Sequence, residues 1–312
     1  VVLGRIDPAT FAGGAVPLAP EKAEAALARV LAPLDLTGAI AAFAVSEVVD
    51  ENMANAARVH AIEWGKDIAT RTLIAFGGAA PLHAARLAEK LDLKRIIVPT
   101  GAGVGSAIGF LRAPIAYEVV RSRYQRLSTF DPDAVNATLE EMRAEARAIV
   151  EPAAGGQDLA EVCTAYMRYV GQGHEISVRL PVRPLTAADA ATLKGAFDEV
   201  YTGLYGRTIP DQDIEILSWT LTVHTVIPAP PPLPEPGASP APPAPVGQRK
   251  VFDPGRAEML ETAIYRRADL APGCRVRGPA LIVEDQTTTV VSAAFEATVN
   301  ALGYLVLTRT EH

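Results

Sequence analysis

The sequence predicts an α/β fold in which a parallel strand pair is followed by an α+β, β-rich domain. An apolar run of strand length, Leu73–Phe76, leads through two glycines into a helical pattern, and a second strand-like run follows at Arg95–Val98. The order strand, helix, strand with short links indicates a right-handed parallel crossover. Strand-like runs dominate later in the chain, so we expect one domain over residues 1–125 and another over residues 126–312.

Periodicity of the apolar residues places the individual elements. Five segments have the 3.6-residue spacing of helices, and they are 20–30, 45–66, 82–91, 131–150 and 186–205. Alternating or β-branched runs predict strands at 73–76, 95–98, 117–127, 161–170, 174–180 and 214–227. Short strands over 249–310 are typical of a small β-barrel or sandwich. Residues 228–245 hold ten prolines in eighteen residues, which favours a polyproline or coil connection.

Composition excludes several classes of protein. The formal net charge is -7 and no basic cluster stands out, which argues against binding to nucleic acid or to an anionic membrane surface. No apolar run of about 18 residues or more is present, so no membrane span is expected. The two cysteines, Cys163 and Cys274, form no Cys-x-x-Cys motif, and we therefore expect a reduced, cytoplasmic setting. The chain begins at Val1 without an initiator methionine, so we expect the later part of a longer or processed chain.

The first candidate site is the turn Gly77-Gly78-Ala79-Ala80-Pro81. Glycines allow a sharp turn and close approach of a ligand, and proline suits the first turn of a helix because its missing N–H costs nothing there. Such a turn directs free backbone N–H groups and the positive end of a helix dipole at one point, which suits a phosphate or the sugar of a nucleotide. An ordinary strand-to-helix turn is the alternative interpretation.

A second glycine turn follows the next strand. Residues 101–109 carry four glycines at near-alternating spacing, among them Gly103 and Gly105, and Ser106 can begin a helix. Ligands of open α/β sheets collect where the strands end and the helices begin. Because the two strands are expected to be parallel neighbours, both turns should lie at one rim and form a nucleotide site.

His83 is the candidate catalytic side chain, because it lies in the first turn of the helix that leaves Gly77-Gly78. The alternative is a histidine that caps the helix or supports another residue. The five histidines have no metal-ligand spacing, so no metal site is expected within the chain. Neither a Gly-x-Ser-x-Gly elbow nor a full Walker loop occurs.

Several of these motifs together resemble the hydantoinase A/oxoprolinase family. The matching segments lie along nearly the whole chain, in the order Leu3–Asp7, Asn52–Ala54 with Arg58, Ala75–Ala84, Ile97–Pro99, Gly103–Gly109, Met167–Gln172, Gly278–Glu284, Thr287–Val291 and Gly303–Leu307. The family usually has Gly-Gly-Ala-Gly-Pro where this chain has Ala80 in the fourth position. The methyl group of Ala80 fits the turn if its φ is negative.

The resemblance implies an actin-like, sugar-kinase-like ATPase lobe followed by the β-rich C-terminal domain. The family's Asp-Thr-Gly-Gly-Thr type loop is absent here, so the resemblance implies the C-terminal portion of a larger subunit. Its implied cofactors are ATP and Mg²⁺. Gly77, Gly78 and Ala79 would then contact the adenosine or its ribose, with the turn Gly103–Gly109 beside it.

The implied reaction is ATP-dependent opening of a cyclic amide, namely hydantoin, N-methylhydantoin or 5-oxoproline. A phosphorylated amide oxygen is a good leaving group, and catalysis of its formation would be mostly positioning and charge neutralisation. Two alternatives stay open: a subunit of an ATP-dependent acetone- or acetophenone-type ketone carboxylase, and a non-catalytic scaffold portion. The implied partners are a hydantoinase B-type subunit and further copies of this chain.

Overall fold

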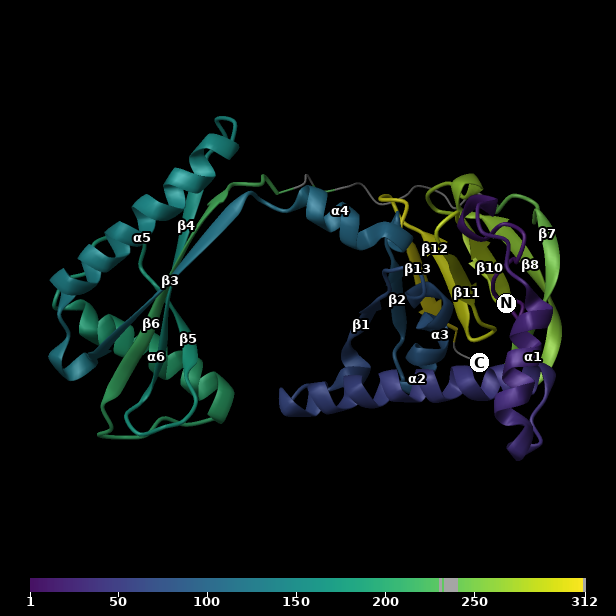
Figure 1. Ribbon diagram of the computed structural model, residues 1–312, viewed down its shortest axis with the longest axis horizontal. Coiled ribbons are helices and arrows are strands. Elements are labelled where there is room, and N and C mark those ends of the chain that lie inside the picture. The colour runs from purple at the N-terminus through teal and green to yellow at the C-terminus, as the bar shows by residue number, and fades with distance from the viewer. Residues whose placement is uncertain (230–231, 233–240, 311–312) are drawn as a thin grey trace. The chain divides into compact units, whose positions relative to one another are not determined.

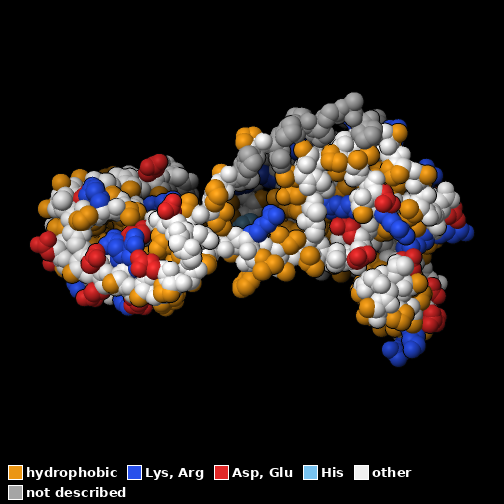
Figure 2. Space-filling model, turned by 90° about the horizontal axis from the view of Figure 1, so that it is seen from above, with side chains coloured by type: hydrophobic (Ala, Val, Ile, Leu, Met, Phe, Trp, Pro, Cys, Tyr) orange, Lys and Arg blue, Asp and Glu red, His pale blue; other side chains and the backbone are white. Residues whose placement is uncertain are grey.

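The computed structural model describes residues 1–229, 232 and 241–310, which form two compact units. Unit 1 consists of Val1–Arg112 with Pro231–His312, and unit 2 of Ala113–Pro230 (Figure 1). The face drawn in Figure 2 carries charges of both signs side by side, with apolar side chains between them. Most of the expected proline-rich connection at 228–245 lies outside the described residues.

Unit 1 contains the predicted strand–helix–strand arrangement. Its first elements are α1 (Pro20–Leu31), α2 (Gly38–Glu63), β1 (Thr72–Ile74), α3 (Ala80–Lys90), β2 (Arg95–Val98) and α4 (Gly105–Arg112). β1 and β2 pair in parallel, as predicted, with Leu73 opposite Ile96. α2 begins seven residues before the expected start at residue 45. In the described ranges no single helix meets the length and hydropathy of a membrane span; Pro20–Leu34 and Gly38–Glu63 meet them only as a pair bent by 80°.

The C-terminal strands return to unit 1 and complete its main sheet. They are β7 (Gly247–Asp253), β8 (Glu258–Arg266), β9 (Arg275–Arg277), β10 (Ala280–Val283), β11 (Thr288–Val291), β12 (Phe295–Val299) and β13 (Leu305–Arg309). β13 pairs with β2 in the order β1-β2-β13-β12-β9. The structure therefore differs from the two consecutive domains, 1–125 and 126–312, that the sequence favours. The physical reason is that Ile96 and Val98 share one core with Leu305 and Leu307.

The remaining C-terminal strands form a second sheet in unit 1. Its order is β11-β10-β8-β7, and β10 and β11 form a hairpin in which Val283 faces Thr288. The expected small barrel or sandwich over residues 249–310 is thus divided between two sheets. The tip of this hairpin, residues 284–287, lies beside the glycine turns described below.

Unit 2 is an α+β unit with one antiparallel sheet. Its elements are β3 (Ala116–Arg126), α5 (Pro132–Ala153), β4 (Leu159–Tyr169), β5 (Ile176–Leu180), α6 (Asp189–Tyr205) and β6 (Ile214–Thr225), and the sheet order is β3-β6-β4-β5. Asp131 caps α5 by accepting a hydrogen bond from the N–H of Ala134 at 3.1 Å. Met142 of α5, Phe197 of α6 and Trp219 of β6 are fully buried in one core.

Candidate functional site

The two glycine turns lie together at the carboxyl ends of β1 and β2. The backbone N–H of Gly77 donates to the carbonyl of Ala102 at 2.6 Å, which ties the first turn to the second. Gly77 has a φ of 105°, a conformation that side chains rarely adopt. This placement agrees with the expected common rim, but the N–H of Gly77 is already occupied by a protein acceptor.

The hairpin tip 284–287 packs against both turns. The hydroxyl of Thr287 donates to the carbonyl of Gly78 at 2.9 Å. A Cβ on Gly103 would lie 2.4 Å from Cβ of Gln286, so Gly103 allows close approach of the protein's own backbone. A Cβ on Gly105 would lie 3.2 Å from the ring of Phe76. These two glycines therefore have a packing role that the sequence did not indicate.

The start of α3 remains open. Gly78 and Ala79 are exposed, and the N–H groups of Gly78, Ala79 and Ala80 have no acceptor within the described chain. Ala80 begins α3 with a negative φ, so its methyl group is accommodated in the turn. Pro81 is buried in the first turn, where its missing N–H costs nothing. The three free N–H groups at the positive end of the helix dipole suit an anionic or strongly polar ligand.

A cleft of about 890 Å³ lies beside this helix start. Gly78 and Leu82 form one side, the hairpin tip 284–287 another, and the N-terminal loop 6–13 faces them. Its volume is in the range of small-molecule and cofactor sites. The buried Arg267 fixes one wall, because it binds Glu284 at 2.8 Å and donates to the carbonyls of Val98 and Gly303. Glu284 is therefore held in an ion pair.

His83 lies between α2 and α3, and it is not among the residues that line the cleft. Its Nδ1 lies 2.7 Å from Oδ1 of Asp50, a fully buried carboxylate on α2. A carboxylate can only accept, so Nδ1 donates and Nε2 of a neutral ring is left as an acceptor. The structure thus gives His83 an orienting partner, and it does not bring His83 into the cleft with Gly78.

The Asp50 carboxylate belongs to a partly buried network of polar side chains. Ser46 donates to Oδ2 of Asp50 at 3.4 Å, and Arg5 donates to the hydroxyl of Ser46 at 3.2 Å. Burial lowers the pKa of Arg5 from its ordinary value, and the negative charges of Asp50 and Glu47 oppose this shift. The hydrogen-bonded side chains of Arg5, Ser46, Asp50 and His83 thus connect the N-terminal loop, α2 and α3.

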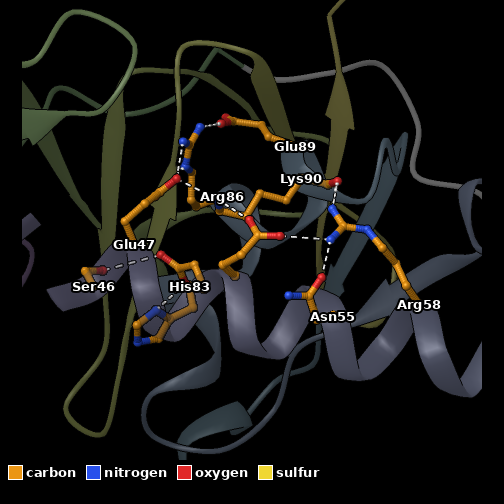
Figure 3. A network of polar contacts seen from close by, with 10 residues as sticks. Ser46, Glu47, Asn55, Arg58, His83, Arg86, Glu89 and Lys90 are labelled. Atoms are coloured by element: carbon orange, nitrogen blue, oxygen red, sulfur yellow. Dashed lines mark hydrogen bonds and ion pairs between the residues drawn. The ribbon is translucent and has the colours of Figure 1, made fainter. Parts of the chain in front are cut away.

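An ion-pair cluster continues along the same helix interface (Figure 3). Arg86 of α3 binds both carboxylate oxygens of Glu47, at 2.6 and 3.0 Å, and Glu89 at 3.1 Å. Lys90 lies 2.6 Å from Glu47 and 2.8 Å from Glu51. Hydrogen bonds from Arg86 lower the pKa of Glu47, and the bonds to Glu47 raise the pKa of Arg86. These pairs fix α3, and hence the free N–H groups at its start, against α2.

Sequence reasoning missed Asp50. One signal was available, because Ser46 and Asp50 are one helical turn apart on the side of α2 that carries the buried Ala42 and Ala54. Polar residues on a buried face are normally hydrogen-bonded, so they indicate a partner on the facing element. Among the described residues no group of three or more His, Cys, Asp or Glu side chains could hold a metal ion.

Comparison with known proteins finds a family model that matches each of the two parts of the chain. A hydantoinase/oxoprolinase family model matches residues 1–119, and a model of the hydantoinase/oxoprolinase C-terminal domain matches residues 133–309. The acetone carboxylase beta subunit of Xanthobacter autotrophicus is 29% identical over 95% of this chain and 43% of its own length. The caprolactamase subunit alpha of Pseudomonas jessenii is 26% identical over 93% of this chain and 42% of its own length.

A solved structure shares the fold. The nucleotide-free structure of acetone carboxylase, which carboxylates acetone in an ATP-dependent reaction, superposes with a TM-score of 0.76 and 27% identity over 99% of this chain and 45% of that chain. The chain thus spans less than half the length of these relatives. The C-terminal family model alone covers more than half of the sequence. The chain belongs to the hydantoinase/oxoprolinase family.

Proposed function

We propose that this chain is the C-terminal part of an ATP-dependent subunit that opens a cyclic amide such as hydantoin, N-methylhydantoin or 5-oxoproline. Unit 1 would be the second lobe of an actin-like, sugar-kinase-like ATPase. Family membership supports the proposal, as does the similarity to a caprolactamase subunit, whose name describes an enzyme acting on a cyclic amide. The multi-subunit enzymes to which the relatives' names refer support a partner, which we propose to be a hydantoinase B-type subunit.

One observation carries the nucleotide site: three N–H groups at the start of α3 have no acceptor among the residues that the structure describes, and Gly78 lines the cleft beside them. The N–H groups of Gly78, Ala79 and Ala80 would hold the nucleotide. Gly77, Gly103, Gly105 and Ser106 would shape the rim rather than donate most of the contacts, because Gly77 binds Ala102 and Gly103 adjoins the hairpin tip. This distribution of roles refines the expectation that all of these residues contact the ligand.

Bound ATP with Mg²⁺ would supply the phosphoryl group that turns the amide oxygen into a leaving group. The protein's own contribution here is to orient the nucleotide through fixed backbone donors that need no rearrangement during the reaction. Mg²⁺ typically keeps several waters and binds phosphate oxygens, so it needs few protein ligands from this chain. Asp50 leaves Nε2 of His83 as the free acceptor, which would let His83 take a proton from a substrate or water on that face of α3.

A ketone carboxylase subunit is the second candidate function, and the similarity to the acetone carboxylase beta subunit favours it. The proposed nucleotide site is the same in both cases. The assembled enzyme with its partner subunit can separate them: ATP consumption with hydantoin or 5-oxoproline supports the hydrolase, and consumption with a ketone and bicarbonate supports the carboxylase. A scaffold portion would bind the partner subunit without binding a nucleotide.

The nucleotide site itself is tested by Gly78→Val. A Cβ at Gly78 meets only the Gln286 carbonyl, at 3.6 Å, so the variant should fold, while its branched side chain covers the free N–H groups. In the complete subunit we expect at least a roughly tenfold loss of affinity for MgATP or a non-hydrolysable analogue by calorimetry. Gly173→Val, in the open turn of unit 2, is the matched control and should bind normally. Unchanged affinity in folded Gly78→Val would remove the site from the start of α3.

A further inference from the structure

A second, smaller cleft lies along α3 in unit 1. Its volume is about 310 Å³, and we call it the Arg5 pocket after the cation that lines it. Its walls are α3 from Leu82 to Glu89, the turn 252–255 between β7 and β8, and residues 290–294 at the end of β11. This volume is at the lower end of the range for ligand pockets, so the pocket suits a small molecule.

Arg5 enters this pocket with most of its hydrogen-bond donors unused. Only 8% of the residue is exposed, and its one hydrogen bond among the described residues runs from Nη1 to the hydroxyl of Ser46. A guanidinium has five N–H donors, so Nε, Nη2 and the second N–H of Nη1 lack an acceptor. Within the described ranges Thr289 Oγ1 is the one fully enclosed side-chain polar atom without a partner, so the free nitrogens of Arg5 reach the pocket. Buried donors are normally satisfied, which indicates an acceptor from outside these residues.

The two carboxylates of the Arg5 pocket are used elsewhere. Glu89 accepts from the Ser292 hydroxyl at 2.7 Å and from Arg86 at 3.1 Å, one bond to each of its oxygens. Asp253 accepts from a backbone N–H of its own turn at 2.9 Å. Neither of them forms an ion pair with Arg5. The pocket therefore offers a cation and no anion to match it.

The charge of Arg5 is compensated only at a distance. The nearby negative charges belong to Asp50, which Arg5 reaches through Ser46, and to Glu47, which binds Arg86. Burial lowers the pKa of Arg5 in spite of these two charges. An anion in the pocket would gain the free N–H donors and would compensate the buried charge directly.

The shape and lining of the pocket indicate which anion fits. The planar guanidinium matches the two oxygens of a carboxylate, which it binds with two parallel hydrogen bonds. Away from Arg5 the lining is largely apolar, through Leu82, Ala85, Phe252 and Val290. We propose that Arg5 binds the carboxylate of a small ligand whose ring or short chain packs on these apolar side chains.

Within the proposed function, this chemistry identifies a substrate class. 5-Oxoproline carries a carboxylate on a cyclic amide, whereas hydantoin and N-methylhydantoin carry none. Leu82 lies within one turn of the free N–H groups at the start of α3 and lines both the Arg5 pocket and the nucleotide cleft, so the ligands of the two clefts are neighbours along α3. The substrate assignment rests on the proposed function, but the carboxylate site does not.

Calorimetry of the complete subunit tests the site with a matched pair of probes. 2-Pyrrolidinone has the ring of 5-oxoproline without its carboxylate. We expect 5-oxoproline to bind at least roughly tenfold more tightly, the range of a hydrogen bond to a charged group. Arg5→Met should bring the two affinities within about threefold, whereas Arg5→Lys keeps the charge and should retain part of the preference. Arg71→Met, an exposed arginine that lines neither cleft, is the control and should bind like the wild type.

Ala293→Phe tests the location of the ligand with Arg5 left in place. Ala293 lines the pocket and is exposed in this chain, so a ring at this position should narrow the pocket without disturbing the bond between Arg5 and Ser46. We expect a roughly tenfold weaker affinity for 5-oxoproline, with a native circular dichroism spectrum.

Three results would overturn the carboxylate site. The first is a wild-type subunit that binds both probes equally or binds neither at about 10 mM, which would mean that another part of the subunit fills the pocket. The second is a preference for 5-oxoproline that survives in folded Arg5→Met. The third is wild-type affinity in Ala293→Phe, because the ligand then binds elsewhere.

Two further measurements separate the substrate assignment and the nucleotide site from this result. Acetate that displaces 5-oxoproline at equal concentration supports the carboxylate site and removes 5-oxoproline as its specific ligand, whereas a need for large excess supports the substrate. Arg5→Met should bind MgATP like the wild type, and Gly78→Val should keep the preference for 5-oxoproline. Failure of the nucleotide site would therefore appear in Gly78→Val, and failure of the carboxylate site in Arg5→Met.

Discussion

Replacing Asp50 with alanine should loosen the helix pair that carries the free N–H groups. Asp50 is fully buried, accepts from His83 at 2.7 Å and lies within the field of the buried Arg5. Removing the carboxylate leaves the Nδ1–H of His83 and the hydroxyl of Ser46 without an acceptor, at about 1–3 kcal/mol for each buried group, and it leaves the charge of Arg5 less compensated. We expect about 3 kcal/mol in total, since the His83 side chain is 25% exposed and the link to Arg5 runs through Ser46.

Hydrogen exchange followed by mass spectrometry measures this loss where it occurs. A local loss of about 3 kcal/mol corresponds to roughly 100-fold faster exchange in peptides of α2 and α3. Fluorescence of Trp219, buried in the core of unit 2, reports whether the other unit stays folded when it is measured in a Trp64→Phe background, because Trp64 lies at the end of α2. Glu63→Ala removes an exposed carboxylate from the same helix and should change exchange by less than about threefold, since surface substitutions are usually within about 0.5 kcal/mol.

The variant Ser46→Ala tests whether the link from Asp50 to Arg5 adds stability beyond the contact between Asp50 and His83. It keeps the contact between His83 and Asp50 and removes the hydroxyl that links Asp50 to Arg5, so we expect a loss of about 1 kcal/mol. If hydrogen exchange in α2 and α3 is as slow in Asp50→Ala as in the Glu63→Ala control, the expected loss of stability is refuted. It would mean that the buried carboxylate gives α2 and α3 no net stability and that His83 owes its orientation to packing alone.

Two further predictions concern other parts of the fold. Hydrogen bonds from Arg183, and further ones from Thr186, hold the pKa of Asp189 well below its ordinary value. The unfolded chain therefore binds this proton more tightly, so unit 2 should lose stability as the pH falls below about 4, and Asp189→Asn should flatten the dependence of Tm on pH there. In urea unfolding, Gly103→Ala should destabilise unit 1 by about 1–3 kcal/mol, because its Cβ would meet the hairpin tip, whereas Gly109→Ala should be neutral or stabilise α4 by up to about 1 kcal/mol.

The local part of the candidate site could be predicted from the sequence. The strand before Gly77, the helix after it and the parallel partner strand all follow from short-range periodicity and turn chemistry, and β1, α3 and β2 lie where these signals place them. Pairing between distant segments could not be predicted in this way. β13 joins β2 because Leu305 and Leu307 fill the same core, and single strands carry no sequence signal that names a partner 200 residues away.

The role of the glycines also depends on contacts between distant segments, which short-range sequence signals do not reveal. Absence of a Cβ at Gly103 is equally compatible with a bound ligand and with close approach of the chain's own backbone. Only the position of Gln286, which belongs to a hairpin far along the sequence, decides between them. Asp50 was overlooked for a related reason, because an acidic residue in a helix is normally solvated and only the packing of α3 makes it buried.

The division of the chain into two family models does not coincide with its two structural units. Unit 1 takes its glycine turns from the part matched over residues 1–119 and the hairpin that packs on them from the part matched over residues 133–309. Thr287 binds the Gly78 carbonyl, and Gln286 adjoins Gly103, so the C-terminal hairpin fixes the loop that presents the free N–H groups. The cleft beside Gly78 therefore exists only when both sequence regions are folded together, and a change in the hairpin tip acts on the proposed nucleotide site as directly as a change in the glycines.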